Sequence, residues 1–219
     1  MTKTLCVLYR FNIVTLALVA LLGLIAPHPV SAEELASSHV SEDVLETAKV
    51  DNFAKVSSTM WRGAQPSDKS LEKLAQGGIK TVIDLRMDGD GIEHESQTVN
   101  TLGLHYVHIP MGFMKPTPDK ILSFLKIVTA PENQPVFVHC RQGADRTGTL
   151  CAIYRRLVQN WTFEECWVEM RTHHFKPFLA SLKRTVQEFQ CDEWRKLLAA
   201  PENKMATQTT VTAAILSKT

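Results

Sequence analysis

The stretch from His139 to Gly148 reads His-Cys-Arg-Gln-Gly-Ala-Asp-Arg-Thr-Gly, and it places a thiol and a guanidinium at the two ends of one short segment. Cys140 opens this segment and Arg146 closes it. A cysteine thiolate is a strong nucleophile, and the planar guanidinium of arginine binds two oxygens of a phosphate at once. The residue types and their spacing therefore predict a loop that holds a phosphate and attacks it.

A strand before this loop and a helix after it would position both groups. Residues 135–138 read Pro-Val-Phe-Val, a run that is typical of a buried strand. Backbone N–H groups and the helix dipole favour an anion at a helix N-terminus, so the place favours a bound phosphate and the thiolate form of Cys140. The apolar stripe that predicts the helix consists of Leu150, Ile153, Tyr154, Leu157 and Val158.

The segment resembles the signature of the cysteine-dependent protein tyrosine phosphatase superfamily, which is His-Cys, any five residues, Arg, then Ser or Thr. His139, Cys140, Arg146 and Thr147 match this signature residue by residue. The resemblance implies that the cysteine attacks phosphorus, that a cysteinyl-phosphate forms and that water hydrolyses it. It also implies that Thr147 assists the sulfur as the leaving group. The loop residues expected to bind the substrate are Arg141, Gln142, Gly143, Ala144, Asp145 and Arg146.

Outside the loop the resemblance is looser and extends from about residue 51 to about residue 171. It includes the stretches 61–66 (Trp-Arg-Gly-Ala-Gln-Pro) and 81–86 (Thr-Val-Ile-Asp-Leu-Arg), and it is greatest to the compact bacterial dual-specificity-like branch. His139 is expected to order the loop through its imidazole. Arg62 and Arg86 are expected to brace loops around the end of the sheet, with contact to the substrate as the alternative. Asp84, at the end of a strand, is expected to be structural.

The resemblance favours a phosphomonoester hydrolase of the protein tyrosine or dual-specificity type, acting on a phosphorylated protein or a small phosphomonoester. Inositol-phosphate and phosphoinositide phosphatases share the fold and often carry Lys inside the loop, whereas here only Arg141 adds charge. A rhodanese-like sulfurtransferase also uses a loop cysteine, but the Arg-Thr-Gly ending favours phosphate. A non-catalytic phosphate-binding module is the remaining alternative.

Two aspartates compete for the role of the acid that protonates the leaving oxygen. The superfamily usually supplies an Asp from a separate loop, but the corresponding stretch 108–119 has none before Asp119. Thr117 and Pro118 precede Asp119 in the pattern of a helix start, where a carboxylate stabilises the helix dipole without catalysis. Asp145 lies in the loop itself, as in similar phosphatases with Asp-Arg-Thr there. We prefer Asp145, with pairing to a neighbouring cation as its alternative.

The rest of the chain alternates predicted strands and helices. This pattern indicates an α/β fold with a mainly parallel central sheet flanked by helices, like that of protein tyrosine phosphatases, and places ligands at the carboxyl ends of the strands. Strands are expected near 60–62, as an edge strand or hairpin, and at 81–85, 104–109 and 135–138. Helices are expected after Ser67 as far as Gly77, at 92–102, from Pro118 to before Pro131, after the Thr162–Glu165 capping box, and at 178–198.

The N-terminus has the three parts of a secretory signal peptide. Lys3 and Arg10 precede an uncharged apolar run over 11–26, and a small-x-small ending predicts cleavage after Ala32. The mature protein is then periplasmic or secreted; an uncleaved membrane anchor is the alternative, although the run is shorter than the roughly 20 residues that span a bilayer. The expected organisation is signal peptide 1–32, linker or peripheral helix 33–50, phosphatase domain 51–200 and disordered tail 201–219.

Charge and cysteine content narrow the partners. Cleavage would remove two basic residues and change the formal charge from +1 to −1, because 22 basic residues then face 23 acidic ones. This near-neutral balance argues against a general binder of nucleic acid or of membrane surfaces. No cofactor and no metal are expected, since His173-His174 has no second ligand pair at matching spacing. Four cysteines remain, of which Cys151 and Cys166 are expected in the core, and their pairing stays open.

Overall fold

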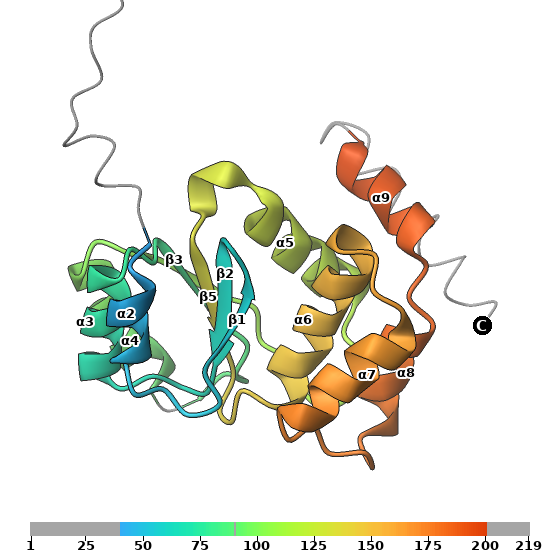
Figure 1. Ribbon diagram of the computed structural model, residues 1–219, viewed down its shortest axis with the longest axis horizontal. Helices are drawn as coiled ribbons and strands as arrows, with labels where there is room; N and C mark the ends of the chain where they lie inside the picture. The colour runs from blue at the N-terminus through green and yellow to red at the C-terminus, as the bar shows by residue number, and fades with distance from the viewer. Residues whose placement is uncertain (1–39, 90, 201–219) are drawn as a thin grey trace, which may run out of the picture. The chain divides into compact units, whose positions relative to one another are not determined.

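A five-stranded sheet runs through the middle of the computed structural model, which describes residues 40–89 and 91–200 (Figure 1). Its order is β1-β2-β5-β3-β4; β1 runs antiparallel to β2, and all other neighbours are parallel. The expected α/β fold with a mainly parallel sheet is confirmed. The strands are β1 (Ala54–Ser57), β2 (Met60–Gly63), β3 (Thr81–Asp84), β4 (His105–His108) and β5 (Val136–His139).

Helices cover both faces of this sheet (Figure 1). Successive side chains of a strand point to opposite faces, so Phe137 packs in one apolar cluster and Val138 in the other. One face carries α2 (Glu42–Glu46), α3 (Asp68–Gln76) and α4 (Ile92–Thr101). The other carries α5 (Pro118–Thr129), α6 (Asp145–Val158), α7 (Phe163–Thr172), α8 (Ala180–Gln187) and α9 (Cys191–Ala199), with a short 3-10 turn η2 (Pro131–Asn133) before β5.

Local capping signals start the helices where the sequence predicts them. The hydroxyl of Ser67 accepts a hydrogen bond from the Ser70 backbone N–H at the start of α3. Thr162 and Glu165 form the predicted capping box of α7. Thr117 is the N-cap of α5, and Pro118 is its first residue. No helix among the described residues is long and apolar enough to span a membrane.

The hairpin expected near 60–62 is confirmed, and one other expectation about the elements is wrong. β2 is the second strand of this hairpin and lies between β1 and β5, so of the two expected arrangements the hairpin holds and the edge strand does not. The single helix expected at 178–198 is divided into α8 and α9. Arg156 of α6 donates to the carbonyls of Val186 and Gln187, which a continuing helix would use itself. Phe189 then turns inward and stacks on Trp194, with 5.3 Å between ring centroids.

The expected signal peptide 1–32 and tail 201–219 lie outside the described residues. Within the segment 33–50, α2 packs on α3 through Leu45, which is buried. A Cβ at Gly77 would come within 2.4 Å of the Leu45 side chain, so a residue without a side chain lets α2 lie this close. The described part of this segment therefore belongs to the packed structure around the sheet.

Candidate active site

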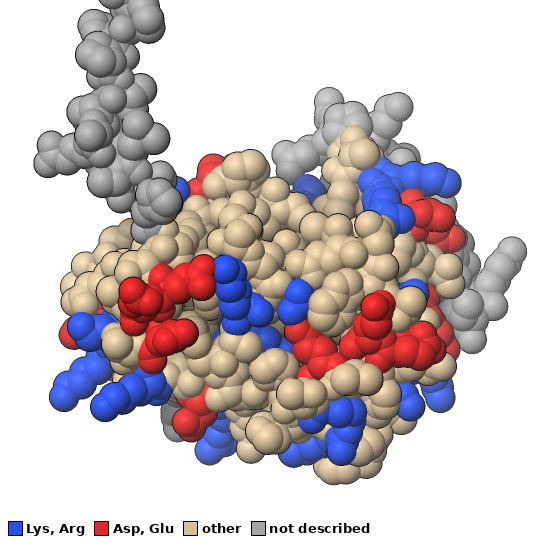
Figure 2. All heavy atoms as spheres, viewed as in Figure 1, with Lys and Arg blue, Asp and Glu red and all other residues tan. Residues whose placement is uncertain are grey.

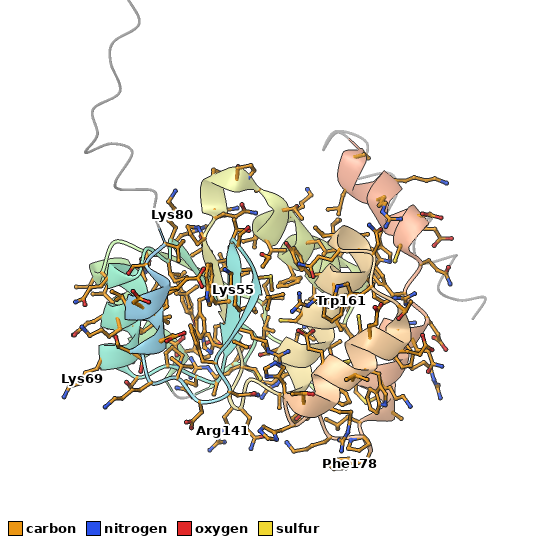
Figure 3. All side chains as sticks on the ribbon, viewed as in Figure 1. Lys55, Lys69, Lys80, Arg141, Trp161 and Phe178 are labelled. Carbon is orange, nitrogen blue, oxygen red and sulfur yellow. The ribbon has the colours of Figure 1, made fainter. Side chains whose placement is uncertain are left out.

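The loop of residues 140–146 connects β5 to α6 at the carboxyl end of the parallel strands. Figure 3 shows this end at the lower edge, where Arg141 projects away from the sheet. Cys140 is only 1% exposed at the base of the loop, whereas Arg141 and Gln142 are exposed. α6 begins at Asp145, so the loop is followed directly by a helix N-terminus, as predicted.

Three successive carbonyls of the loop are held by donors from outside it. The carbonyl of Arg141 accepts from the Gln65 backbone N–H (3.4 Å) and that of Gln142 from the Asn52 side-chain amide (3.3 Å). The carbonyl of Gly143 accepts from the Arg62 guanidinium at 2.6 Å. Since the C=O and N–H of one trans peptide unit point in opposite directions, these bonds turn the following N–H groups the other way.

The loop N–H groups are left without acceptors. Across the described residues, no backbone N–H from Arg141 to Thr147 donates a hydrogen bond to the protein. Successive unpaired N–H groups at a helix N-terminus form a concavity that binds anions. The geometry therefore supports the predicted substrate-binding stretch, including its backbone contribution from the buried Ala144.

Gly143 is required at its position by both conformation and space. Its φ is +66°, in the left-handed region, and an added Cβ would lie 2.4 Å from the Gly63 carbonyl carbon and 2.6 Å from the Ala64 nitrogen. The loop consequently packs directly against the chain that leaves β2. This close approach is what lets donors beside β2 reach the loop carbonyls.

Arg146 contacts the two neighbouring loops at this edge. Its NH1 lies 3.5 Å from the Leu85 carbonyl and 3.4 Å from the Met111 carbonyl. Its guanidinium carbon lies 5.1 Å from the ring centroid of Phe113. Within the described chain its Nε has no hydrogen-bond partner, and the same is true of the buried hydroxyl of Thr147. Arg146 and Thr147 thus each have a polar atom at the loop that could still form a hydrogen bond with a ligand.

Asp145 is 3% exposed, and both of its carboxylate oxygens contact Lys176. Oδ1 accepts from the Lys176 backbone N–H (2.8 Å), and Oδ2 pairs with its ammonium (3.0 Å). That ammonium also donates to Oε1 of Gln142 at 2.6 Å. In the structure Asp145 is therefore paired with a neighbouring cation, Lys176, which is the alternative that the sequence leaves open for it. Asp119 is exposed in the first turn of α5, as expected from its position.

A buried group of charged side chains braces the ends of β3 and β5. Arg86 Nε donates to both oxygens of Asp84 at 3.0 and 2.9 Å, and Arg86 NH2 donates to Oε2 of Glu95 at 2.8 Å. His139 lies with Nε2 2.7 Å from Oε1 of Glu95 and Nδ1 3.4 Å from the Cys140 carbonyl. The expected bracing by Arg86 and the expected structural role of Asp84 are confirmed.

The Arg86 guanidinium balances the carboxylates of this buried group. Burial alone would raise the pKa of Asp84, but the Arg86 hydrogen bonds and the nearby His139 outweigh it, and the pKa is lowered. Asp84, Glu95 and His139 lie close enough to share an ion. The Arg86 guanidinium already bridges the two carboxylates, so a cation is supplied by the protein itself.

None of the four cysteines in the described chain forms a disulfide. Burial raises the pKa of Cys151 to about 11 and that of Cys166 to about 12. Both thiols are fully buried in the apolar cluster beneath α6 and α7. Their expected role as small core residues is confirmed.

Sequence reasoning missed Asn52, Gln65 and Lys176 as residues of this site. Asn52 has φ +53° and joins the hairpin to two distant segments, through the Gln142 carbonyl and through His173, whose Nδ1 lies 2.8 Å from its Oδ1. An Asp-Asn pair before a strand indicates a turn, but it does not say what the amide contacts. Gln65 lies in the 61–66 stretch of the resemblance, which was the one signal available for it.

The chain is similar in sequence to known phosphatases. The model of one protein family, described as DSP-PTPase phosphatase fused to NAD+ Kinase, matches residues 34–189. The chain is 30% identical over 125 residues to the dual specificity protein phosphatase TpbA of Pseudomonas aeruginosa (strain UCBPP-PA14), covering 57% of this chain and 55% of that protein. It is 27% identical over 161 residues to the inositol diphosphatase SIW14 of Saccharomyces cerevisiae, covering 69% and 56%.

The fold is shared with a solved structure. The core catalytic domain of PP-IP phosphatase SIW14 from S. cerevisiae, in complex with citrate, superimposes with a TM-score of 0.61 at 24% identity. The match covers 68% of this chain and 91% of that one. By contrast, the chain spans about half the length of the two curated relatives, with 55% and 56% of their residues matched.

Proposed function

The chain belongs to the family of DSP-PTPase phosphatases described as fused to NAD+ kinase, and from this membership we propose that it is a cysteine-dependent phosphomonoester hydrolase. The observation that carries the proposal is the row of backbone N–H groups from Arg141 to Thr147, which have no acceptor among the described residues and directly follow the buried Cys140. Such a row suits the oxygens of a phosphoryl group, and Arg146 adds a charged donor.

In the proposed reaction the Cys140 thiolate attacks phosphorus, so that an S–P bond forms while the P–O bond of the ester breaks. The leaving oxygen takes a proton from an acid, for which we propose Asp145 after its contact with Lys176 loosens. Water then attacks phosphorus, the S–P bond breaks to release the Cys140 thiolate, and the Asp145 carboxylate takes the proton that the water loses. The Thr147 hydroxyl, which has no partner among the described residues, is available to donate to the departing sulfur.

The entrance to the loop favours a substrate whose phosphate is carried by an apolar or aromatic group. Three large apolar side chains are exposed on the loops that Arg146 contacts: Met87 (54%), Phe113 (49%) and Met114 (75%). Exposed apolar groups beside a polar site commonly contact a ligand. We therefore place a phosphorylated protein, with phosphotyrosine foremost, before inositol diphosphates. Similarity to the yeast inositol diphosphatase keeps the second class as the alternative.

A substrate panel tests this function. Purified protein is assayed with p-nitrophenyl phosphate, phosphotyrosyl and phosphoseryl peptides, a diphosphoinositol polyphosphate, and thiosulfate with cyanide. We expect hydrolysis of the aryl phosphates, fastest with the phosphotyrosyl peptide, and no measurable turnover by Cys140→Ser. Cys191→Ser is the matched control. Cys191 lies on α9, and its thiol donates to the Arg156 carbonyl instead of belonging to the loop.

Other outcomes of the panel have definite meanings. Faster turnover of the diphosphoinositol substrate would support the alternative class and contradict the role of the apolar entrance. Sulfur transfer from thiosulfate without phosphate release would contradict the hydrolase. Phosphopeptide binding that is equal in wild type and Cys140→Ser, with no turnover by either, would indicate a binding module.

We also propose that the protein is exported to the periplasm or secreted. The support is the order of a basic start, an apolar run and a small-x-small ending in residues 1–32. Intact mass of the protein expressed in a bacterial host should correspond to a chain that begins at Glu33. A mature protein that retains residues 1–32 and fractionates with membranes would support the anchored alternative instead.

A further inference from the structure

Arg62 is a fully buried cation that has no carboxylate partner among the described residues. Its side chain is 0% exposed, and its single hydrogen bond there joins NH2 to the Gly143 carbonyl. Its Nε and NH1 are buried without any partner in the described chain. A buried guanidinium is normally paired, because removing its charge from water is costly. The unpaired state of Arg62 therefore calls for a compensating negative charge.

The fold places this cation on the same side of the sheet as Cys140. Arg62 of β2 lies in register with Val138 of β5, and side chains two positions apart on a strand share a face. Val138 and Cys140 both belong to the apolar cluster beneath α6. A Cβ at Gly148, in the first turn of α6, would lie 3.6 Å from Arg62 NH2. The guanidinium thus lies next to the helix start that follows the loop.

Other buried cations show how unusual this arrangement is within the described chain. Arg86 is balanced by Asp84 and Glu95, and Arg155 is balanced by Glu169. The charge of Arg62 also affects a neighbouring histidine. Burial and, to a smaller extent, the positive charge of Arg62 lower the pKa of His173 to about 4. The field of Arg62 consequently reaches the segments around the loop.

We propose that Arg62 is a positioning residue whose charge is balanced by the anions of the reaction, the Cys140 thiolate and the bound phosphoryl group. Its bond to the Gly143 carbonyl holds the loop open for these anions, and its charge stabilises them through the loop. This inference rests on the proposed function, because it assumes that the loop binds phosphate. It assigns Arg62 a role beyond bracing.

The test compares Arg62→Gln, which removes the charge and keeps an N–H donor, with Arg62→Lys, which keeps the charge. Binding of inorganic phosphate is measured by calorimetry and by the shift in melting temperature. We expect Arg62→Gln to bind phosphate about tenfold to a hundredfold more weakly than wild type, and Arg62→Lys to recover most of that loss. The rate at which iodoacetamide alkylates Cys140 at neutral pH should follow the same order.

Arg156→Gln is the matched control. Like Arg62, Arg156 has a buried Nε without a partner in the described residues and donates to main-chain carbonyls. Its acceptors are Val186 and Gln187 at the end of α8, not a residue of the loop. The Arg156→Gln variant should therefore bind phosphate like wild type. Phosphate binding by Arg62→Gln within threefold of wild type, or equal losses in Arg62→Gln and Arg62→Lys, would overturn the proposal.

A second measurement applies if circular dichroism shows that Arg62→Gln does not fold. The NMR resonance of the Arg62 Nε–H is then followed in the Cys140→Ser protein, and it is identified because it is lost in the double variant Cys140→Ser/Arg62→Lys. This resonance should shift when phosphate is added. A resonance that does not move would overturn the proposal. Turnover of p-nitrophenyl phosphate by wild type separates the two ideas. Wild type that binds phosphate without hydrolysing it contradicts the proposed function alone, whereas active wild type with unchanged phosphate binding in Arg62→Gln contradicts this inference alone.

Discussion

Asp145 and Lys176 show how a single residue of the loop is tied to a segment outside it. The carboxylate of Asp145 accepts from both the main chain and the side chain of Lys176, and the same ammonium holds Gln142. An acid in this position must exchange the lysine for the leaving oxygen of the substrate. Loop residues and the segment after α7 therefore act together in the proposed step.

Replacement of each candidate acid separates their roles. Asp145→Asn should lower kcat by about a hundredfold or more for phenyl phosphate, whose leaving group needs a proton, and much less for p-nitrophenyl phosphate. Asp119→Asn, at the exposed start of α5, should leave both rates near those of wild type. Steady-state kinetics with the two substrates measures the ratio. A larger leaving-group effect in Asp119→Asn would assign the acid to Asp119 instead.

At the scale of elements, the β1–β2 hairpin acts as the outer support of the loop. Asn52 before the hairpin, Arg62 in β2 and Gln65 after it each hold one loop carbonyl. The end of α7 joins this support, because His173 lies against Asn52. Two parts of the chain that are distant in sequence, residues 52–65 and the end of α7, therefore determine which way the loop N–H groups point.

The His173 contact predicts a pH dependence of stability. Burial lowers the pKa of His173 from the ordinary 6.5 to about 4, so between these values the unfolded chain binds a proton that the folded chain does not. The free energy of unfolding must therefore fall as the pH decreases from 6.5 to 4. Urea unfolding of wild type should show this fall, and His173→Asn, which keeps a donor for Asn52, should show less of it. His105→Asn, at an exposed position of β4, is the control. The same pH slope in wild type and His173→Asn would contradict the prediction.

Elements that depend on local signals were predictable from sequence, and those that depend on distant contacts were not. The N-caps Ser67 and Thr162 mark their helices because the side chain of each accepts a hydrogen bond within one turn, and Pro118 marks the start of α5. The division of α8 from α9 depends on Arg156, about thirty residues earlier in the chain, so the periodicity of 178–198 could not reveal it. For the same reason the nucleophile loop could be identified, whereas its supports Asn52 and Lys176 could not.

At the scale of the whole molecule, the sheet order brings the loops of the candidate site together. The order β1-β2-β5-β3-β4 puts β5 in the middle, so the loops after β2 and β3 flank the one that carries Cys140. On the face seen in Figure 2, basic and acidic side chains are interspersed, and neither sign covers the face alone. This distribution fits the near-neutral charge of the sequence and a substrate selected at the loop entrance rather than by a broad charged surface.

Alkylation of Cys140 in the presence and absence of orthovanadate tests most directly whether this loop holds a thiolate in an oxyanion site. Iodoacetamide is added at pH 6.5, and mass spectrometry follows the peptides that contain Cys140 and the half-buried Cys191. Cys140 should react at least about tenfold faster than Cys191, since the thiolate is the reactive form, and orthovanadate should suppress only the Cys140 reaction. Equal rates at the two cysteines, with no protection by orthovanadate, would contradict the assignment of Cys140 as the nucleophile.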